Sequence, residues 1–213
     1  MRTPRTGFQV FSNFVSTLDG IVSLQVRGHS GGGDINGFSP QDRLVMGLLR
    51  AVADVVIVGS GTLASDPRHV WTAEVICPEL ASEYRKLEHK LGKHGPALNV
   101  LVSASGRVNL RLPLFAGGMV QALILTTASG SRRLLKQRVP SSVQILALPS
   151  RAGKIASATM LEALDRVNAG KRVLVEGGPT LLGTFYKSRS LDEQFLTIAP
   201  QISGRDIDGG RLS

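Results

Sequence analysis

Short apolar runs recur along the chain and are separated by polar, glycine-containing segments. Continuous runs of Val, Ile and Leu are typical of strands that are buried on both faces. The first run stops at the turn sequence Thr17-Leu18-Asp19-Gly20, and the second stops at Gly59-Ser60-Gly61-Thr62. We expect strands at residues 9–15, 54–58, 98–102, 120–127, 143–148, 171–176 and 194–198.

The segments between these runs carry apolar residues at helical spacing. The clearest begins with Ser39 as an N-cap, Pro40 at the first helical position and Asp42 as an early carboxylate. Its apolar face is predicted to consist of Leu44, Val45, Leu48, Leu49 and Val52. We expect helices at residues 40–52, 79–91, 129–138, 157–169 and 179–186. The glycine-rich segment at 28–37 is expected to be a mobile loop, either simply flexible or lying over a ligand.

Strands and helices therefore alternate over nearly the whole chain. Such alternation with short connections favours an α/β fold with a largely parallel sheet covered by helices on both faces. No linker, repeat or shift in composition divides the sequence. We expect a single domain over residues 1–213.

Composition indicates the kind of cellular compartment that the protein occupies. Apolar residues make up 42% of the chain and charged residues 19%, which disfavours extended disorder. The longest mostly apolar stretch, at 114–125, is shorter than the roughly 20 residues that a bilayer-spanning helix needs. The basic N-terminus leads into no signal-peptide core. Cys77 is the only cysteine, which excludes an internal disulfide framework and fits a reducing cytoplasm. We expect a soluble cytoplasmic protein without a membrane partner.

The charge balance points to an anionic ligand. Lys and Arg total 25 against 16 Asp and Glu, a net charge of +9. Nucleic-acid binding is better supported by clustered basic residues interleaved with aromatics. Here the basic residues are scattered, and there are one Trp and two Tyr. We therefore expect no nucleic-acid partner; an anionic substrate or cofactor is favoured, and a basic surface without a ligand is the alternative.

The sharpest local signal is the segment 176–183, EGGPTLLG, at the end of a predicted strand. Gly177 and Gly178 allow a tight turn and a close approach of backbone to ligand. Pro179 suits the first helical position, and the N–H groups of the helix that follows would favour a phosphate. The spacing matches neither the Rossmann fingerprint nor the P-loop. A tight strand-to-helix turn without a ligand is the other interpretation.

Three charged residues are ambiguous in the sequence alone. Glu176, at a strand end, could contact a heterocycle or transfer a proton, or it could cap a turn or pair with a lysine. Asp19, at the end of the first strand, has the same alternatives. Arg50, among apolar positions of a helix, is either a surface residue with a buried stem or a fork directed at a phosphate.

Other chemistries find little support. The four histidines show no convincing metal-ligand spacing, so no metal site is expected. A zinc deaminase would need H-x-E paired with P-C-x-x-C, and no G-x-S-x-G elbow is present.

Taken together, these segments resemble the reductase domain of bacterial riboflavin biosynthesis, which normally follows a pyrimidine deaminase. The resemblance runs in order over roughly residues 8 to 204. The matching segments are STLDG at 16–20, LLRA at 48–51, VGSGT at 58–62 with DP at 66–67, VEGGPTL at 175–181, LDE at 191–193 and IAPQISG at 198–204.

The resemblance implies the fold of dihydrofolate reductase and an NADPH-dependent reduction. The substrate implied is 5-amino-6-(5-phosphoribosylamino)uracil, a phosphorylated pyrimidine whose ribosyl group becomes ribityl. Arg50, Glu176 and Asp34 are the expected substrate contacts, with Arg50 on the phosphate. Asp19 and Glu176 are the catalytic candidates. A homodimer is expected by resemblance as well.

The resemblance also implies where the cofactor lies. Residues 178–184 would hold the pyrophosphate, and Thr62 and Asp66 would contact the cofactor from a facing loop. Ser103 and Arg107 would receive the 2′-phosphate, for which an arginine is suited. The full set of expected cofactor contacts is Ser16, Gly59, Thr62, Asp66, Ser103, Gly177, Gly178, Pro179, Thr180, Leu181, Leu182 and Gly183.

The sequence departs from the family in three ways. It carries no deaminase domain, so we expect reduction without deamination. The loop 62–67 is one residue short and lacks the arginine expected beyond it, for which Arg68 is a substitute. The chain ends where relatives usually continue into a final strand pair, so we expect either a truncated sequence or an open sheet edge. A dihydrofolate, pteridine or other pyrimidine reductase, or a non-catalytic NADP-binding protein, therefore remains an alternative.

Overall fold

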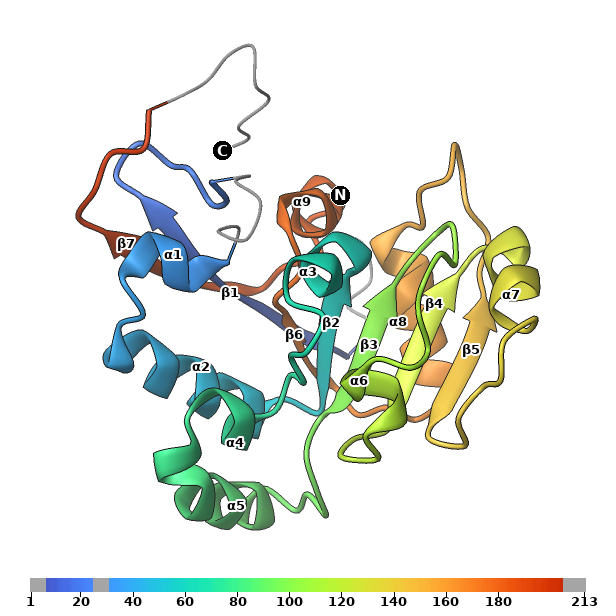
Figure 1. Ribbon diagram of the computed structural model, residues 1–213, viewed down its shortest axis with the longest axis horizontal. Coiled ribbons are helices and arrows are strands. Elements are labelled where there is room, and N and C mark those ends of the chain that lie inside the picture. The colour runs from blue at the N-terminus through green and yellow to red at the C-terminus, as the bar shows by residue number, and fades with distance from the viewer. Residues whose placement is uncertain (1–6, 25–30, 205–213) are drawn as a thin grey trace.

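The computed structural model describes residues 7–24 and 31–204 and shows a seven-stranded sheet in the order β5-β4-β3-β2-β6-β1-β7 (Figure 1). Neighbouring strands are parallel throughout. The predicted α/β class and parallel sheet are confirmed. The strands are β1 (Gln9–Thr17), β2 (Val55–Gly59), β3 (Leu98–Val102), β4 (Ala122–Thr126), β5 (Val143–Ala147), β6 (Arg172–Val175) and β7 (Glu193–Ala199).

Helices connect the strands and cover both faces of the sheet. They are α1 (Gly32–Asn36), α2 (Pro40–Val52), α3 (Ser60–Ser65), α4 (Ala73–Ile76), α5 (Ala81–Lys90), α6 (Pro113–Ala116), α7 (Ala128–Leu134), α8 (Ser157–Arg166) and α9 (Pro179–Lys187), with a 3₁₀ turn at Pro78–Leu80. The five helices expected from periodicity are all present, with ends that differ by a few residues.

Two apolar clusters, one on each face of the sheet, form the core. On one face Leu49 of α2, Phe115 of α6 and Leu134 of α7 pack on strand residues such as Val56 and Leu101. On the other face α8 and α9 cover the alternate strand residues. The alternation of strand side chains between the two clusters follows from the period of two along each strand. The continuously apolar runs therefore correspond to strands that are buried on both sides.

The order of strands places the carboxyl ends of β1, β2 and β6 side by side. β6 lies between β2 and β1, so β1 contacts only strands that come from the last part of the chain. Ligands of open α/β sheets bind beyond the carboxyl ends of strands where the connection changes direction. The segments that follow β2 and β6 meet at this point.

Two segments expected to be loops contain helices. Residues 32–36 of the glycine-rich segment form α1, because buried Ile35 anchors it and the Asp34 carboxylate accepts from the Gly31 N–H at 3.0 Å. Residues 25–30 lie outside the described part of the chain. Residues 60–65 form α3 rather than a loop, because Leu63 is buried and Gly59 provides an extended N-cap. Because both segments are rich in glycine, their sequences did not indicate the helices α1 and α3.

The packing of α2 also differs from the expectation. Leu44 and Leu48 were predicted to face inward, but they are 44% and 43% exposed. The helix instead packs closely on α5, where a Cβ on Gly47 would come within 2.4 Å of the Tyr84 hydroxyl. Arg50 and Ala51 are directed into the protein in place of the two leucines.

The two sheet edges differ in burial. At one edge β5 is partly buried, with Val143 buried and Ile145 and Leu146 half-buried, whereas at the other edge β7 pairs, among the described strands, only with β1 and is exposed along most of its length. Leu196 and Ile198 of β7 are 46% and 58% exposed, and Ile202 beyond it is exposed as well. Among the described residues, no helix has the length and apolar character needed to cross a membrane.

Candidate active site

A large cavity of about 1760 Å³ opens beyond the carboxyl ends of β1, β2, β3 and β6. Pockets for one small ligand measure about 300–1,000 Å³. This cavity therefore has room for two ligands side by side. Its lining combines the glycine turn before α9, the start of α3, one face of α2 and the segment before α8.

The glycine turn between β6 and α9 forms one wall. Gly178 is the N-cap of α9 with no side-chain cap, and Pro179 is at the first helical position. The Gly178 N–H donates to Thr62 Oγ1 at 2.9 Å, which joins this turn to α3. Pro179 has no N–H and the Leu181 N–H donates to the Gly178 carbonyl at 3.0 Å, so the first turn of α9 presents the Thr180 N–H and the positive end of the helix dipole to the cavity.

The space around the two glycines of this turn differs. A Cβ on Gly177 would lie 2.4 Å from Leu181 Cδ2 and 3.0 Å from the Gly59 nitrogen, so this position is closed by packing. A Cβ on Gly178 would meet only Thr62 Oγ1, at an ordinary 3.5 Å. Gly178 thus leaves open space that a side chain would fill. Open space beside the positive end of a helix fits a phosphate.

The floor of the cavity holds a buried ion pair. Arg50 NH2 lies 2.8 Å from Glu176 Oε2, and the side chains are 2% and 5% exposed. Arg50 Nε donates to the same carboxylate at 3.0 and 3.2 Å, and NH1 donates to the Thr72 carbonyl. The interpretation of Arg50 as a surface residue was therefore wrong. Its nitrogens are directed at acceptors within the protein.

His69 completes this cluster. Arg50 NH1 lies 3.0 Å from His69 Nε2, and the imidazole packs edge-on against Trp71 with ring centroids 5.0 Å apart. A guanidinium offers only donors, so Nε2 must accept, and the proton of the neutral ring is assigned to Nδ1. Nδ1 faces Asp66 Oδ2 at 3.6 Å. Burial and the charge of Arg50 lower the pKa of His69 to about 4.

Most of the residues predicted from the sequence line this cavity. All three expected substrate contacts, Arg50, Glu176 and Asp34, are in the lining. So are nine of the expected cofactor contacts. These are Gly59, Thr62, Asp66, Gly177, Gly178, Pro179, Thr180, Leu181 and Gly183.

Asp19 and three of the twelve expected cofactor contacts lie outside the lining. Asp19 accepts from Thr17 Oγ1 and from the Ser203 and Gly204 N–H groups, which lower the pKa of its carboxyl, so it stabilises the turn after β1. Ser16 and Ser103 are 6% and 1% exposed, and Leu182 belongs to the core under α9. The structure thus does not bring Asp19 to the site.

Several cavity residues were missed in the sequence. Arg107 and Arg68 are exposed and lie outside the lining, whereas Arg43, Arg151, Lys154 and Lys187 line it. Arg43 is two turns before Arg50 on the same face of α2, and its Nε donates to the Ile76 carbonyl at 2.8 Å. The i, i+7 spacing of Arg43 and Arg50 was the available signal. No group of three or more potential metal-ligating side chains forms within 7–24 and 31–204.

Comparison with known proteins gives a consistent answer. The sequence matches the RibD C-terminal domain family over residues 9–212. It is 26% identical over 199 residues to an Archaeoglobus fulgidus 2,5-diamino-6-ribosylamino-4(3H)-pyrimidinone 5′-phosphate reductase, covering 92% of this chain and 83% of the relative. It is also 27% identical to Escherichia coli riboflavin biosynthesis protein RibD, over 80% of this chain and 44% of the relative.

Solved structures show the same fold. Acinetobacter baumannii RibD superposes with a TM-score of 0.70 at 20% identity, over 94% of this chain and 48% of that chain. The chain thus spans about half the length of the RibD proteins that it matches. This likeness confirms the expected dihydrofolate reductase-like fold. The chain belongs to the RibD C-terminal domain family, whose relatives include reductases of the riboflavin pathway.

Proposed function

We propose that this protein is an NADPH-dependent reductase that converts the ribosyl group of 5-amino-6-(5-phosphoribosylamino)uracil, or of its 2-amino counterpart, to a ribityl group. The proposal treats residues 1–213 as one reductase domain. It rests on the family to which the chain belongs and on the residues at the two ends of the cavity. Riboflavin-pathway reductases supply the reaction class, and a nicotinamide cofactor follows from that class.

One observation carries the proposal: a phosphate cradle and a buried carboxylate–guanidinium pair share one cavity. The cradle is the uncapped start of α9 at Gly178, and the pair is Arg50 with Glu176. Two ligands must lie side by side for hydride transfer, with the reacting carbons about 3–3.5 Å apart. The volume of about 1760 Å³ is sufficient for a dinucleotide and a sugar-phosphate substrate together.

The chemistry places few demands on protein side chains. Bound NADPH would supply a hydride, which adds to C1′ of the ring-opened imine form of the sugar. With a proton taken up by the nitrogen, the C1′–N double bond would become a single bond. The protein has to bind the two ligands, align their reacting carbons and exclude water.

The residues divide between these tasks. The start of α9 would hold the pyrophosphate, and Asp66 and Thr62 would contact the cofactor from α3. Glu176 would accept hydrogen bonds from pyrimidine N–H groups or sugar hydroxyls. Arg50 already forms hydrogen bonds with Glu176, His69 and the Thr72 carbonyl. We therefore propose that it positions Glu176 instead of binding the phosphate.

The substrate phosphate then needs another cation, and Arg43 is the best placed. It lines the cavity on the substrate side of α2, and hydrogen bonding to Ile76 fixes its Nε. It forms no ion pair with any residue in the described part of the chain. Its terminal nitrogens therefore remain for a phosphate.

The test is NADPH oxidation, followed by absorbance, with three substrates offered separately. These are the aminouracil phosphate, the diaminopyrimidinone phosphate and dihydrofolate. We expect turnover of at least one ribosylaminopyrimidine and none of dihydrofolate. Glu176→Gln should lower kcat/KM by about tenfold or more, because a neutral amide weakens charge-assisted hydrogen bonds.

Three results would argue against the proposal. Turnover of dihydrofolate alone would identify a pteridine reductase. NADPH binding without turnover of any substrate would identify a non-catalytic NADP-binding protein. A Glu176→Gln variant with the wild-type rate would remove the assigned role of Glu176.

A further inference from the structure

The segment that joins β5 to α8 ends in a very tight turn that carries two cations. The Arg151 N–H donates to the Lys154 carbonyl at 3.0 Å, and the Lys154 N–H donates to the Arg151 carbonyl at 2.9 Å. The two residues between them, Ala152 and Gly153, have φ values of 48° and 72°. Two positive φ values in a two-residue connection are the mark of a type I′ turn.

This geometry places the two side chains together. Residues that exchange both backbone hydrogen bonds in an antiparallel pair project their side chains from the same face, with Cβ atoms about 5 Å apart. Arg151 and Lys154 are therefore neighbours on one face of the turn. Neither forms an ion pair with another residue in the ranges 7–24 and 31–204.

The adjacent positive charges of Arg151 and Lys154 and the backbone conformation of Ala152 are both unfavourable without a ligand. Like charges directly opposite each other in an antiparallel pair repel. Ala152 is in the left-handed region, where a Cβ is disfavoured, although glycine would fit that position without strain. An anion between Arg151 and Lys154 would offset the repulsion. A doubly charged phosphate matches two cations better than a carboxylate does.

The turn faces the cavity at the cofactor end. Arg151 and Lys154 both line it, and so do Ile155 and Met160, which continue from the turn into α8. The Ser157 and Ser188 hydroxyls lie 2.6 Å apart, which ties the first residue of α8 to the end of α9. The turn that carries the cation pair is thus connected through the start of α8 to the C-terminal end of α9.

We propose that Arg151 and Lys154 bind the 2′-phosphate of NADPH and so select NADPH over NADH. This inference rests on the proposed function, because it assigns the far end of the same dinucleotide. The start of α9 would hold the pyrophosphate, and Arg151 and Lys154 would hold the 2′-phosphate. Ser103 and Arg107, which the family resemblance suggested for this role, lie outside the cavity lining.

The test measures binding of NADP⁺ and of NAD⁺ by calorimetry, without any need for turnover, because these two nucleotides differ only in the 2′-phosphate. The wild-type protein should bind NADP⁺ at least about tenfold more tightly, as expected for charge-assisted hydrogen bonds to one phosphate. The double variant Arg151→Ala and Lys154→Ala should bind the two nucleotides with equal affinity. Its affinity for NAD⁺ should stay within about twofold of wild type, since the pyrophosphate site is untouched.

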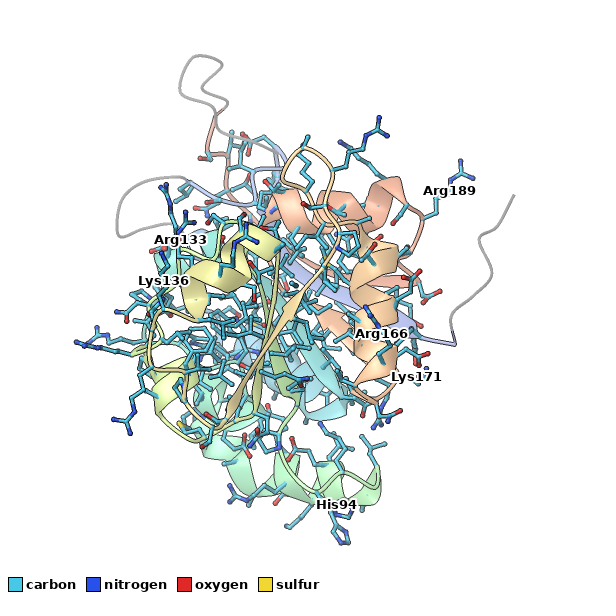
Figure 2. All side chains as sticks on the ribbon, turned by 90° about the vertical axis from the view of Figure 1, so that its right-hand side faces the viewer. His94, Arg133, Lys136, Arg166, Lys171 and Arg189 are labelled. Atoms are coloured by element: carbon cyan, nitrogen blue, oxygen red, sulfur yellow. The ribbon has the colours of Figure 1, made fainter. Side chains whose placement is uncertain are left out.

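A matched control removes the same charge elsewhere. Lys136 and Arg189 are exposed, lie outside the lining and project outward from the fold (Figure 2). Replacing both with alanine should leave the preference for NADP⁺ over NAD⁺ intact at moderate salt, where long-range effects of net charge are screened.

The outcomes separate the inference from the proposed function. An Arg151/Lys154 variant that keeps the wild-type preference would overturn the inference. An equal loss of affinity for both nucleotides would overturn it too, and would place the pair on the pyrophosphate. Wild-type protein that binds the two nucleotides equally would refute 2′-phosphate recognition while leaving a nicotinamide reductase possible. Binding of neither would refute both the inference and the proposed function.

Discussion

At the scale of single residues, the buried Arg50–Glu176 pair shows what a sequence can and cannot tell. The residue types and the segments that carry them identified both as site residues. That the two residues pair could not be predicted, because they are 126 positions apart in the sequence. Only the folded sheet brings α2 beneath the end of β6. Removing one member of a buried pair typically costs about 3–5 kcal/mol, since the other charge is left uncompensated.

His69 gives the first prediction at this scale. Its pKa is about 4 in the folded protein against 6.5 as the ordinary value. The unfolded chain therefore binds the proton first, so this contribution to stability is complete above pH 6.5 and is lost as the pH falls towards 4. The difference corresponds to roughly 3 kcal/mol.

Urea unfolding between pH 7.5 and 4 checks this expectation. His69→Gln offers Arg50 an acceptor that does not titrate, so the stability of this variant should fall less than that of wild type over this range. Parallel stability curves for the two proteins would show that His69 does not retain the low pKa.

At the scale of elements, long periodic segments were predictable and short ones were not. The helix at 40–52 and the strand at 98–102 were predicted with the observed bounds, because a long apolar period and a bounded Val/Leu run are each unambiguous. α1, α3, α4 and α6 have four to six residues each, too few to show a period. Tertiary burial of one residue, such as Leu63 in α3, determines them instead.

The turn before α9 gives a prediction for an element. Gly178 has φ −58° and ψ 170°, which any residue adopts, and its Cβ would have ordinary space. Gly178→Val should therefore fold normally and weaken NADPH binding by about tenfold or more, because the side chain would occupy the phosphate approach. Calorimetry measures the affinity, and thermal unfolding measures the stability.

Two further variants serve as controls. Gly95→Val introduces the same side chain into open space away from the cavity and should change neither quantity. Gly177→Ala should lower stability, because its Cβ would overlap Leu181. If Gly178→Val retains wild-type affinity, the pyrophosphate is not bound at this turn.

At the scale of the whole molecule, the exposed β7 edge is the feature that most needs a partner. Leu18, Leu196, Ile198 and Ile202 lie exposed at this end, and an uncovered edge strand is an aggregation risk. We propose that a second copy of the chain covers the edge, in agreement with the homodimer expected from resemblance. Light scattering coupled to gel filtration should then report twice the chain mass.

Ile198→Lys tests the location of this contact. A charge on the β7 face should shift the protein towards monomer at micromolar concentration, because desolvating an unpaired ammonium is unfavourable. Leu135→Lys alters an equally exposed leucine after α7, at the opposite side of the sheet, and should leave the mass unchanged. Dimerisation of the Ile198→Lys variant with wild-type affinity would place the interface elsewhere.

The insertion of β6 between β2 and β1 also sets the order in which the protein can form during synthesis. β1 emerges from the ribosome before the other six strands, yet both of its partners, β6 and β7, begin at Arg172 and Glu193. The nascent chain must hold β1 unpaired until β6 has been translated, which delays long-range pairing. Chains released before residue 172 would lack both Glu176 and the strand that joins β1 to β2, so we expect no activity from them.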